Sequence, residues 1–200
     1  MKIFLSTCLF LAILSEGEAD ICHIHKPGEK NSNENCVTSK GGSCFVHYNA
    51  NNLNGSLKNE SESGCTTNCT SENYSFTSED GRFFRSFRSC CRYGKCTQLF
   101  IKKLSRKLNG RECPTCCPAF SKACKGSKAI KCHNDETQCA AFVVAYDDIA
   151  IPEKDFYGCA SPSFCALAKK SKHSDALSGT ITRARCSDTL RSLKQLNYEG

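Results

Sequence analysis

One hydrophobic run near the start of the chain differs from all the others. It extends from Ile3 to Leu14, follows Lys2 and is followed by the small residues of Gly17-Glu18-Ala19. A basic residue, about a dozen apolar residues and a small-residue site together are typical of a secretory signal peptide. The run is too short for a membrane-spanning helix, which needs about twenty apolar residues. We therefore expect residues 1–19 to be a cleaved signal, with an uncleaved anchor as the alternative.

The other hydrophobic residues lie in short segments rich in Phe, Val, Thr and Tyr. Stretches of Gly, Asn, Ser and Asp separate these segments, and no sustained 3.6-residue periodicity appears. Such patterning favours β-strands joined by turns over helices. The chain is therefore predicted to be all-β, with strands in the segments Cys44 to Tyr48, Gly81 to Cys91, Cys139 to Tyr146 and Gly179 to Cys186.

The cysteine content gives the most information about the cellular compartment and the source of stability. The chain has 18 Cys in 200 residues, no Trp and a hydrophobic fraction of 40 % that includes every Cys. This composition indicates an oxidising compartment. It also leaves too few large aliphatic residues for one large hydrophobic core. A disulfide that closes a loop of about 20 residues contributes on the order of 3 kcal/mol. Removal of Cys8 with the signal leaves 17 cysteines, so one thiol remains without a partner.

The cysteines occur twice in the same order. The first set recurs after 94 to 96 residues, as Cys36, Cys44, Cys65, Cys69 and Cys90 followed by Cys132, Cys139, Cys159, Cys165 and Cys186. This repeat predicts two related domains, residues 20–98 and 111–191. Residues 99–110 form a basic linker between them and residues 192–200 a C-terminal tail. Because Phe100, Leu104 and Leu108 have helical spacing, a short amphipathic helix is the alternative to an ordinary linker.

These cysteine patterns resemble a known superfamily. Ser-Cys90-Cys91-Arg-Tyr-Gly-Lys-Cys96-Thr resembles the closing Cys-Cys-x4-Cys-Asn signature of Ly6/uPAR three-finger domains, with Thr97 in place of the Asn. The second domain is similar to the same family in its order of Cys113-x-x-Cys116, Cys124, Cys132, Cys139, Gly-Cys159, Cys165 and Cys186. The two-domain layout resembles the gamma subunit of phospholipase A2 inhibitors. The resemblance implies two disulfide-rich three-finger domains in tandem.

The resemblance also implies a disulfide pairing. It joins Cys22 with Cys44, Cys36 with Cys65, Cys69 with Cys90, Cys91 with Cys96, Cys113 with Cys139, Cys132 with Cys159, Cys165 with Cys186, and Cys124 with Cys116 or Cys117. One of Cys116 and Cys117 is left unpaired, with Cys117 as the candidate free thiol; it would be capped, buried or the link of a covalent dimer. The chain departs from the family twice, because the first domain has His25 where a second cysteine is expected and the second domain lacks the closing signature.

Four Asn-x-Ser/Thr sequons are clustered in a polar stretch of twenty residues. They are Asn54, Asn59, Asn68 and Asn73. Their clustering predicts a glycosylated surface loop, and the alternative is a polar loop without glycans.

A basic tract extends from Arg82 to Arg111 without an acidic residue. Its ten cations, interleaved with aromatic residues, are Arg82, Arg85, Arg88, Arg92, Lys95, Lys102, Lys103, Arg106, Lys107 and Arg111. In a secreted protein such a tract points to sulfated glycans, anionic lipid surfaces or an acidic protein face, and not to nucleic acid. The alternative is a solvated face of strand and linker without a ligand.

No pattern of catalytic residues appears. The five His are scattered, and none belongs to a hydrolase or metalloprotease motif. Cys113-x-x-Cys116 with Cys132-His133 has a spacing compatible with zinc, but cysteines matched by the repeat in an oxidising compartment favour disulfides. We therefore expect no enzymatic activity, no metal and no cofactor.

The predicted function is that of a secreted, non-enzymatic binding protein that recognises an extracellular protein through its finger loops. Candidate contact segments are Asn49 to Ser63, Asp147 to Phe156 and Ala168 to Ser178. The resemblance implies either an inhibitor of secreted phospholipase A2 or a relative with another ligand. The alternative is a matrix or cell-surface protein held on sulfated glycans by the tract 82–111. We expect neither a transmembrane segment nor a glycolipid anchor, and oligomer formation stays open.

Overall fold

The computed structural model describes residues 19–28, 34–91, 107–114, 129–170 and 173–191. The first half contains β1 (Ile21–His23), β2 (Asn35–Val37), β3 (Ser43–Asn51), β4 (Lys58–Thr66), β5 (Glu72–Ser78) and β6 (Phe83–Cys91). The second half contains β7 (Leu108–Pro114), β8 (Ala129–His133), β9 (Gln138–Tyr146), β10 (Lys154–Ala160), α3 (Pro162–Lys169), β11 (His173–Ser174), β12 (Gly179–Asp188) and β13 (Leu190–Arg191). The predicted strand segments are all strands, and the fold is all-β apart from α3.

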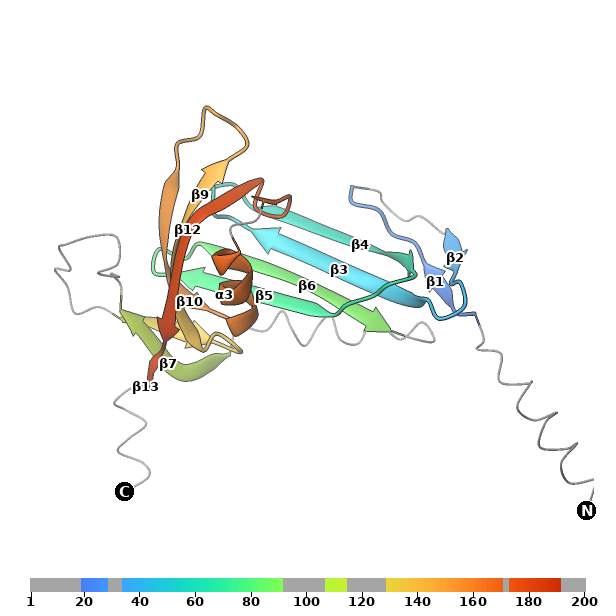
Figure 1. The fold of residues 1–200 in the computed structure, drawn as a ribbon, viewed down its shortest axis with the longest axis horizontal. Coiled ribbons are helices and arrows are strands. Elements are labelled where there is room, and N and C mark those ends of the chain that lie inside the picture. Colours follow the sequence, from blue (N-terminus) through green and yellow to red (C-terminus); the bar gives the residue numbers. More distant parts are fainter. Residues whose placement is uncertain (1–18, 29–33, 92–106, 115–128, 171–172, 192–200) are drawn as a thin grey trace, which may run out of the picture.

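A single antiparallel sheet runs through both halves of the described chain. Its eight strands have the order β11-β12-β9-β10-β5-β6-β3-β4, so two hairpins of each domain contribute to it. The remaining hairpins form a small β1-β2 sheet and a β13-β7-β8 sheet. Figure 1 shows the first domain extending to one side and the second domain standing against its end. The two disulfide-rich domains are therefore joined edge to edge.

The seam of the large sheet lies between β10 and β5. Gly158 pairs with Ser78 there. A Cβ atom on Gly158 would lie 2.0 Å from the carbonyl oxygen of Thr77, so only glycine fits this close approach. Gly64 has the equivalent place before a cysteine in the first domain, but a Cβ atom on Gly64 would meet only Phe45, at 3.5 Å. The two repeats thus use the same glycine differently, because β4 is an edge strand and β10 is not.

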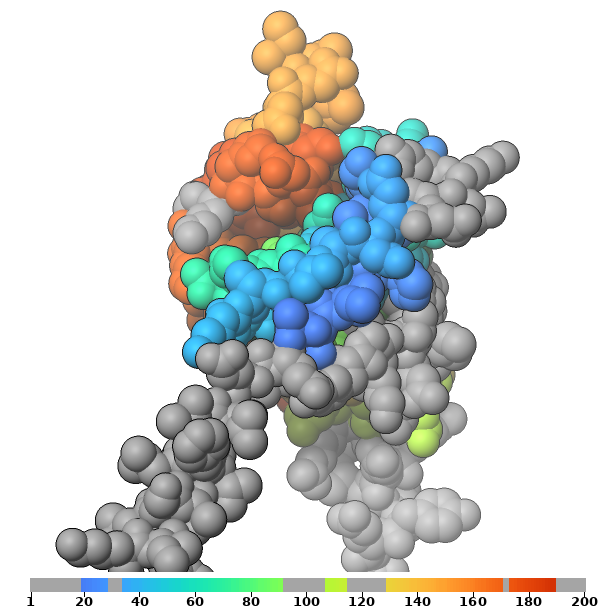
Figure 2. All heavy atoms as spheres, turned by 90° about the vertical axis from the view of Figure 1, so that its right-hand side faces the viewer, coloured from blue at the N-terminus to red at the C-terminus, as the bar shows by residue number. Residues whose placement is uncertain are grey.

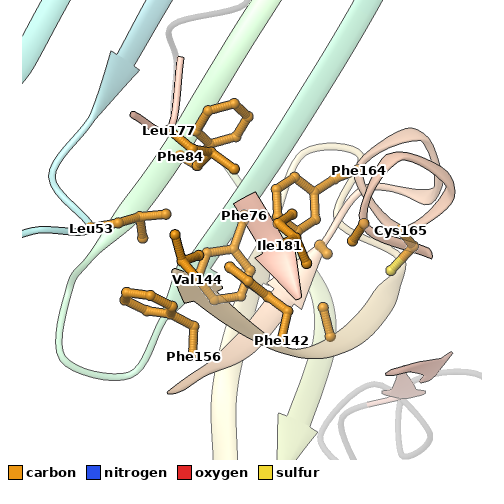
Figure 3. Packing of buried hydrophobic residues seen from close by; sticks show 13 residues of the cluster. Leu53, Phe76, Phe84, Phe142, Val144, Phe156, Phe164, Cys165, Leu177 and Ile181 are labelled. Carbon is orange, nitrogen blue, oxygen red and sulfur yellow. The ribbon is translucent and has the colours of Figure 1, made fainter. Parts of the chain in front are cut away.

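The main hydrophobic core belongs to both domains. Phe76 and Phe84 come from the first domain, and Phe142, Phe156 and Phe164 come from the second. The Phe76 ring lies 4.8 Å from that of Phe142 and 5.6 Å from that of Phe164, measured between centroids. Figure 3 shows Phe76 surrounded by second-domain side chains. Each domain is too poor in apolar residues to enclose these rings alone, so burial of the rings holds the domains together.

Disulfides form a separate hub in each domain. The described residues contain Cys22–Cys44, Cys36–Cys65, Cys69–Cys90, Cys113–Cys139, Cys132–Cys159 and Cys165–Cys186. Each of these joins cysteines that the resemblance pairs. Cys91 is also disulfide-bonded, whereas Cys96, Cys116, Cys117 and Cys124 lie outside the described residues. None of these six disulfides crosses between the domains.

Helix α3 was not predicted. Ser161 caps it by accepting a hydrogen bond from the Phe164 N–H at 3.2 Å, and Pro162 occupies the first turn. Phe164, Cys165 and Ala168 are its buried residues. Eight residues are too few to show a helical period, and the Ser-Pro start was the available signal. The helix is too short to cross a membrane, and the described residues contain no helix that could.

Two further expectations about local structure were wrong. The polar sequon-bearing stretch contains strand β4, because its backbone pairs with β3 along Lys58–Thr66; its first three residues are exposed and most of the others are half-buried. Leu108, expected in the linker, begins β7. The rest of the linker up to residue 106, including Phe100 and Leu104, lies outside the described residues, as do residues 1–18 of the signal and the tail 192–200.

The shared core predicts that the domains unfold together. Phe76→Ala should lower the free energy of unfolding by about 3–5 kcal/mol, as expected for truncation of a buried Phe. Guanidinium unfolding with intact disulfides, followed by far-UV circular dichroism, measures this loss. Leu57→Ala, at an exposed position, is the control and should change stability by less than about 0.5 kcal/mol. Two resolved transitions, with only one shifted by Phe76→Ala, would contradict a common core.

Candidate functional site

The most prominent surface feature is the turn between β9 and β10. Figures 1 and 2 show this hairpin projecting beyond the rest of the described chain. Ile149 at its tip is 100 % exposed, and Ile151 is half-buried. The Ala150 N–H donates to the Asp148 carboxylate at 2.9 Å, and the Ile151 N–H donates to the Asp148 carbonyl at 3.0 Å. The turn therefore presents an apolar side chain on an ordered backbone.

The base of this hairpin is braced by the segment that precedes β12. The Asp147 N–H donates to the Ser178 carbonyl at 3.0 Å. His173 Nε2 lies 3.1 Å from both carboxylate oxygens of Asp147. The candidate segment Asp147 to Phe156 is thus both accessible at its tip and fixed at its base, while Phe156 itself is buried in the shared core.

The other two candidate segments pack against each other. In the first, Leu53 is buried in the shared core, and the Asn51 side chain donates to the Ala176 carbonyl at 2.5 Å. In the second, Leu177 is 4 % exposed, and Ser178 Oγ accepts a hydrogen bond from Lys58 Nζ at 2.6 Å. Much of Asn49 to Ser63 and Ala168 to Ser178 therefore serves the domain contact, although Leu57 remains exposed.

The basic tract does not form one exposed face in the described residues. Arg85 lies in the domain contact, where its Nη2 is 2.9 Å from the carboxylate of the fully buried Glu136. Thr77 also donates to Glu136, at 2.8 Å. Burial raises the pKa of Glu136, and the nearby Arg85 charge opposes that shift. The interpretation of Arg85 as a surface contact for polyanions was wrong, because its charge is used to compensate a buried carboxylate.

The other members of the tract have separate surroundings. The guanidinium of Arg88 lies 4.4 Å above the Phe45 ring, Arg82 forms an ion pair of 2.9 Å with Asp80, and Arg111 donates to Thr189 at 3.1 Å. Lys107 is exposed. Arg92, Lys95, Lys102, Lys103 and Arg106 lie outside the described residues.

The predicted sequons differ in accessibility. Asn59 and Asn68 are exposed, and the Asn54 side-chain oxygen accepts a hydrogen bond from the Ser56 N–H at 3.0 Å in an exposed turn. Asn73 is half-buried at the domain contact, where its Nδ2 donates to Asp135 at 2.6 Å and its carbonyl accepts from Ser163 Oγ. A glycan on Nδ2 of Asn73 would therefore obstruct the contact between domains.

Sequence reasoning also missed a polar row on the inner face of the first domain. His47 Nδ1 lies 3.2 Å from the Glu62 carboxylate, and its Nε2 lies 3.2 Å from Ser86 Oγ. This is the order of groups in a hydrolase triad. Ser86, however, is buried in β6, whose backbone pairs with β3 and β5 on both sides. Backbone N–H groups engaged in sheet pairing cannot stabilise an oxyanion beside Ser86, so the row does not support hydrolysis.

Two sulfur clusters have the compactness of metal sites. Cys22, Cys36 and Cys65 have sulfur atoms within 4.8 Å of one another, as do Cys113, Cys132 and Cys159. All six cysteines are disulfide-bonded. Since thiolates are the metal ligands and disulfide sulfurs are not equivalent donors, these clusters are disulfide hubs.

Known proteins that are similar to this chain in sequence include inhibitors of phospholipase A2, although no family model matches the chain. The B form of the phospholipase A2 inhibitor gamma subunit from Gloydius brevicaudus siniticus is 29 % identical over 89 residues, covering 43 % of this chain and 44 % of that protein. The protein of the same name from Laticauda semifasciata is 29 % identical over 114 residues, covering 55 % of this chain and 62 % of that protein. The chain thus spans about half the length of the curated relatives it matches.

A solved structure also aligns with most of the chain. The crystal structure of mouse TEX101 has 16 % sequence identity and a TM-score of 0.33, covering 86 % of this chain and 99 % of that chain. The sequence matches confirm the resemblance to gamma subunits of phospholipase A2 inhibitors that the cysteine order indicated.

The Arg85–Glu136 pair generates a stability prediction. Arg85→Met should lower the free energy of unfolding at neutral pH by about 3–5 kcal/mol, because it leaves a buried carboxylate without its cation. The loss should shrink as the pH falls through the raised pKa of Glu136, since a protonated carboxyl needs no cation. Thermal or guanidinium unfolding between pH 4 and pH 7 measures it.

An exposed ion pair supplies the control for that experiment. Lys26 and Glu34 lie 3.6 Å apart with both side chains more than half exposed. Lys26→Met should therefore cost less than about 1 kcal/mol. An equally small loss with Arg85→Met at neutral pH would show that Arg85 does not compensate a buried charge.

Glycan mapping tests the arrangement at Asn73. The secreted, folded protein should carry no glycan at Asn73, because the side chain is used between the domains, while Asn59 should accept one. Mass spectrometry of glycopeptides from secreted protein measures site occupancy. Full occupancy of Asn73 in monomeric, folded material would be incompatible with the domain contact described above.

Proposed function

We propose that this protein is secreted and acts as a non-enzymatic binding protein, with the β9–β10 tip of its second domain as the main contact to an extracellular protein. The single observation that carries the proposal is the fully exposed Ile149 on a projecting, hydrogen-bonded turn. Large apolar side chains isolated at such a position bury substantial surface when a partner covers them. The relatives named above support a binding protein of the phospholipase A2 inhibitor type.

Rigidity favours this hairpin over the other candidate segments. β9 pairs with β10 and β12 on its two sides, and Cys139 and Cys159 anchor the two strands to the disulfide hub at their far ends. A loop that is ordered before binding loses less conformational entropy when it meets a partner. The tip therefore combines accessibility with a low cost of ordering.

Charge indicates the character of the partner surface. Asp147 and Asp148 precede Ile149, and Glu153 follows it, all of them exposed. Carboxylates around a central apolar residue complement an apolar depression with a basic rim. We propose secreted phospholipases A2 as the partner class, on the basis of the relatives' names.

Binding measurements with purified secreted phospholipases A2 test this proposal. Ile149→Asp should weaken binding at least tenfold in Kd while leaving the unfolding free energy unchanged, because the side chain makes no contribution to the core. Leu57→Asp places the same charge on another exposed tip and should retain binding. Surface plasmon resonance provides Kd, and circular dichroism verifies folding.

The outcomes test the partner class and the contact surface separately. If no secreted phospholipase A2 binds, the partner class is wrong. If a bound extracellular protein retains full affinity for Ile149→Asp, the assignment of the contact to the β9–β10 tip is wrong. Retention on heparin at physiological salt that survives both substitutions would instead favour the alternative of a glycan-held protein.

A further inference from the structure

A pocket of about 240 Å³ lies where the second β-hairpin of the first domain meets the loop before β12. One wall consists of His47 and Asn49 on β3 with Glu60 and Glu62 on β4. Cross-strand pairing sets Asn49 opposite Glu60 and His47 opposite Glu62, so these four side chains share one face of the sheet. The second domain contributes Ala176 and Asp175, whose side chain is fully exposed, and Pro27 completes the lining.

The lining is acidic. It contains three carboxylates, Glu60, Glu62 and Asp175, and no lysine or arginine. Glu62 is engaged by His47, and Asp175 lies 3.6 Å from His173 Nδ1. The Glu60 carboxylate has no hydrogen-bond or ion-pair partner among the described residues. Lys58 is the nearest cation along β4, but its ammonium is bound to Ser178. The lining therefore carries negative charge with no lysine or arginine among its residues.

A buried amide gives a second and independent indication of a ligand. Asn49 lines the pocket although only 7 % of the residue is exposed. Its side-chain oxygen has no hydrogen-bond partner in the described residues. A buried acceptor without a donor costs free energy, and a donor group from a bound molecule would remove that cost.

The size of the pocket restricts the ligand. A volume of 240 Å³ is about that of eight water molecules, enough for one long side chain. The carboxylates do not converge as a metal site would require, because the described residues show no cluster of acidic ligand atoms within 4.8 Å of one another. Separated carboxylates and an amide oxygen match the spread donors of a guanidinium or an ammonium on a flexible stem.

We propose that this pocket binds a cationic side chain, arginine or lysine, of an extracellular protein. Glu60 on β4 and Asp175 in the loop before β12 supply the charge, and the Asn49 oxygen accepts a hydrogen bond from an N–H group of the cation. Because the walls come from both domains, the pocket exists only when the domains are packed together. The claim that a protein carries the cation rests on the proposed function. The claim that the pocket prefers a cation is independent of it.

Binding of a blocked amino acid tests the pocket without any partner protein. The intact secreted chain should bind Nα-acetyl-arginine methylamide or its lysine counterpart with a Kd on the order of 1 mM, as expected for a ligand of this size. The matching citrulline derivative, a neutral isostere of arginine, should bind at least fivefold more weakly. Isothermal titration calorimetry at low salt measures the affinities.

Matched variants test the location. Glu60→Gln combined with Asp175→Asn should weaken binding of the cation about tenfold. Asp148→Asn combined with Glu153→Gln removes the same charge from the β9–β10 tip and should leave the affinity unchanged. Circular dichroism and the unfolding free energy verify that both double variants fold, as their exposed positions predict.

Three results would overturn the proposal: equal affinity for citrulline and for both cations, equal weakening in the two double variants, or no binding of either cation at tenfold the expected Kd. None of these depends on whether a phospholipase A2 binds. Conversely, loss of partner binding in Ile149→Asp says nothing about the pocket, so the two proposals fail separately.

Discussion

Burial of aromatic rings between two cysteine-rich domains is the constraint on which the rest of the structure depends. Each domain has a disulfide hub of its own, but the hubs bury few large apolar side chains. Phe76 and Phe84 are enclosed only because the second domain supplies Phe142, Phe164 and Ile181. Disulfides limit the freedom of the unfolded chain, whereas these rings belong to the largest cluster of buried apolar side chains among the described residues. The disulfides lie within the domains, and the aromatic rings lie in the contact between them.

The domain contact also decides which loops remain available. The ends of β3 and β12 meet over Leu53 and Leu177 and so become part of the core. The β9–β10 turn lies away from this contact and keeps Ile149 in solvent. The same contact brings Asp175 and Glu60 into one lining and thereby creates the acidic pocket. The domain contact thus explains both why Ile149 stays accessible and why the acidic pocket forms.

Local patterning was sufficient to predict the strands β3, β6, β9 and β12. Segments such as Cys139 to Tyr146 are rich in β-branched and aromatic residues, and the cysteine repeat marked where each hairpin belongs. The helix escaped prediction because Pro162–Lys169 makes barely two turns. Arg85 was misassigned because its partner, Glu136, belongs to the other domain and leaves no local signal. The same holds for the pocket, whose walls are distant in sequence. Long-range contacts of this kind cannot be derived from spacing alone.

Strand β4 is an edge strand of the large sheet, and an open sheet edge can promote self-association. The first finger covers only part of this strand, through the pairing of His25 with Ser63. The stretch from Lys58 to Glu62 therefore leaves outward-facing amide and carbonyl groups open to water, and such a margin can template growth by another copy. Charged side chains at every second position, Lys58, Glu60 and Glu62, and the absence of bulky apolar residues oppose that growth. An oligosaccharide on Asn59 would add a steric barrier at the same margin, which links the polar character of this stretch to solubility in a crowded extracellular fluid.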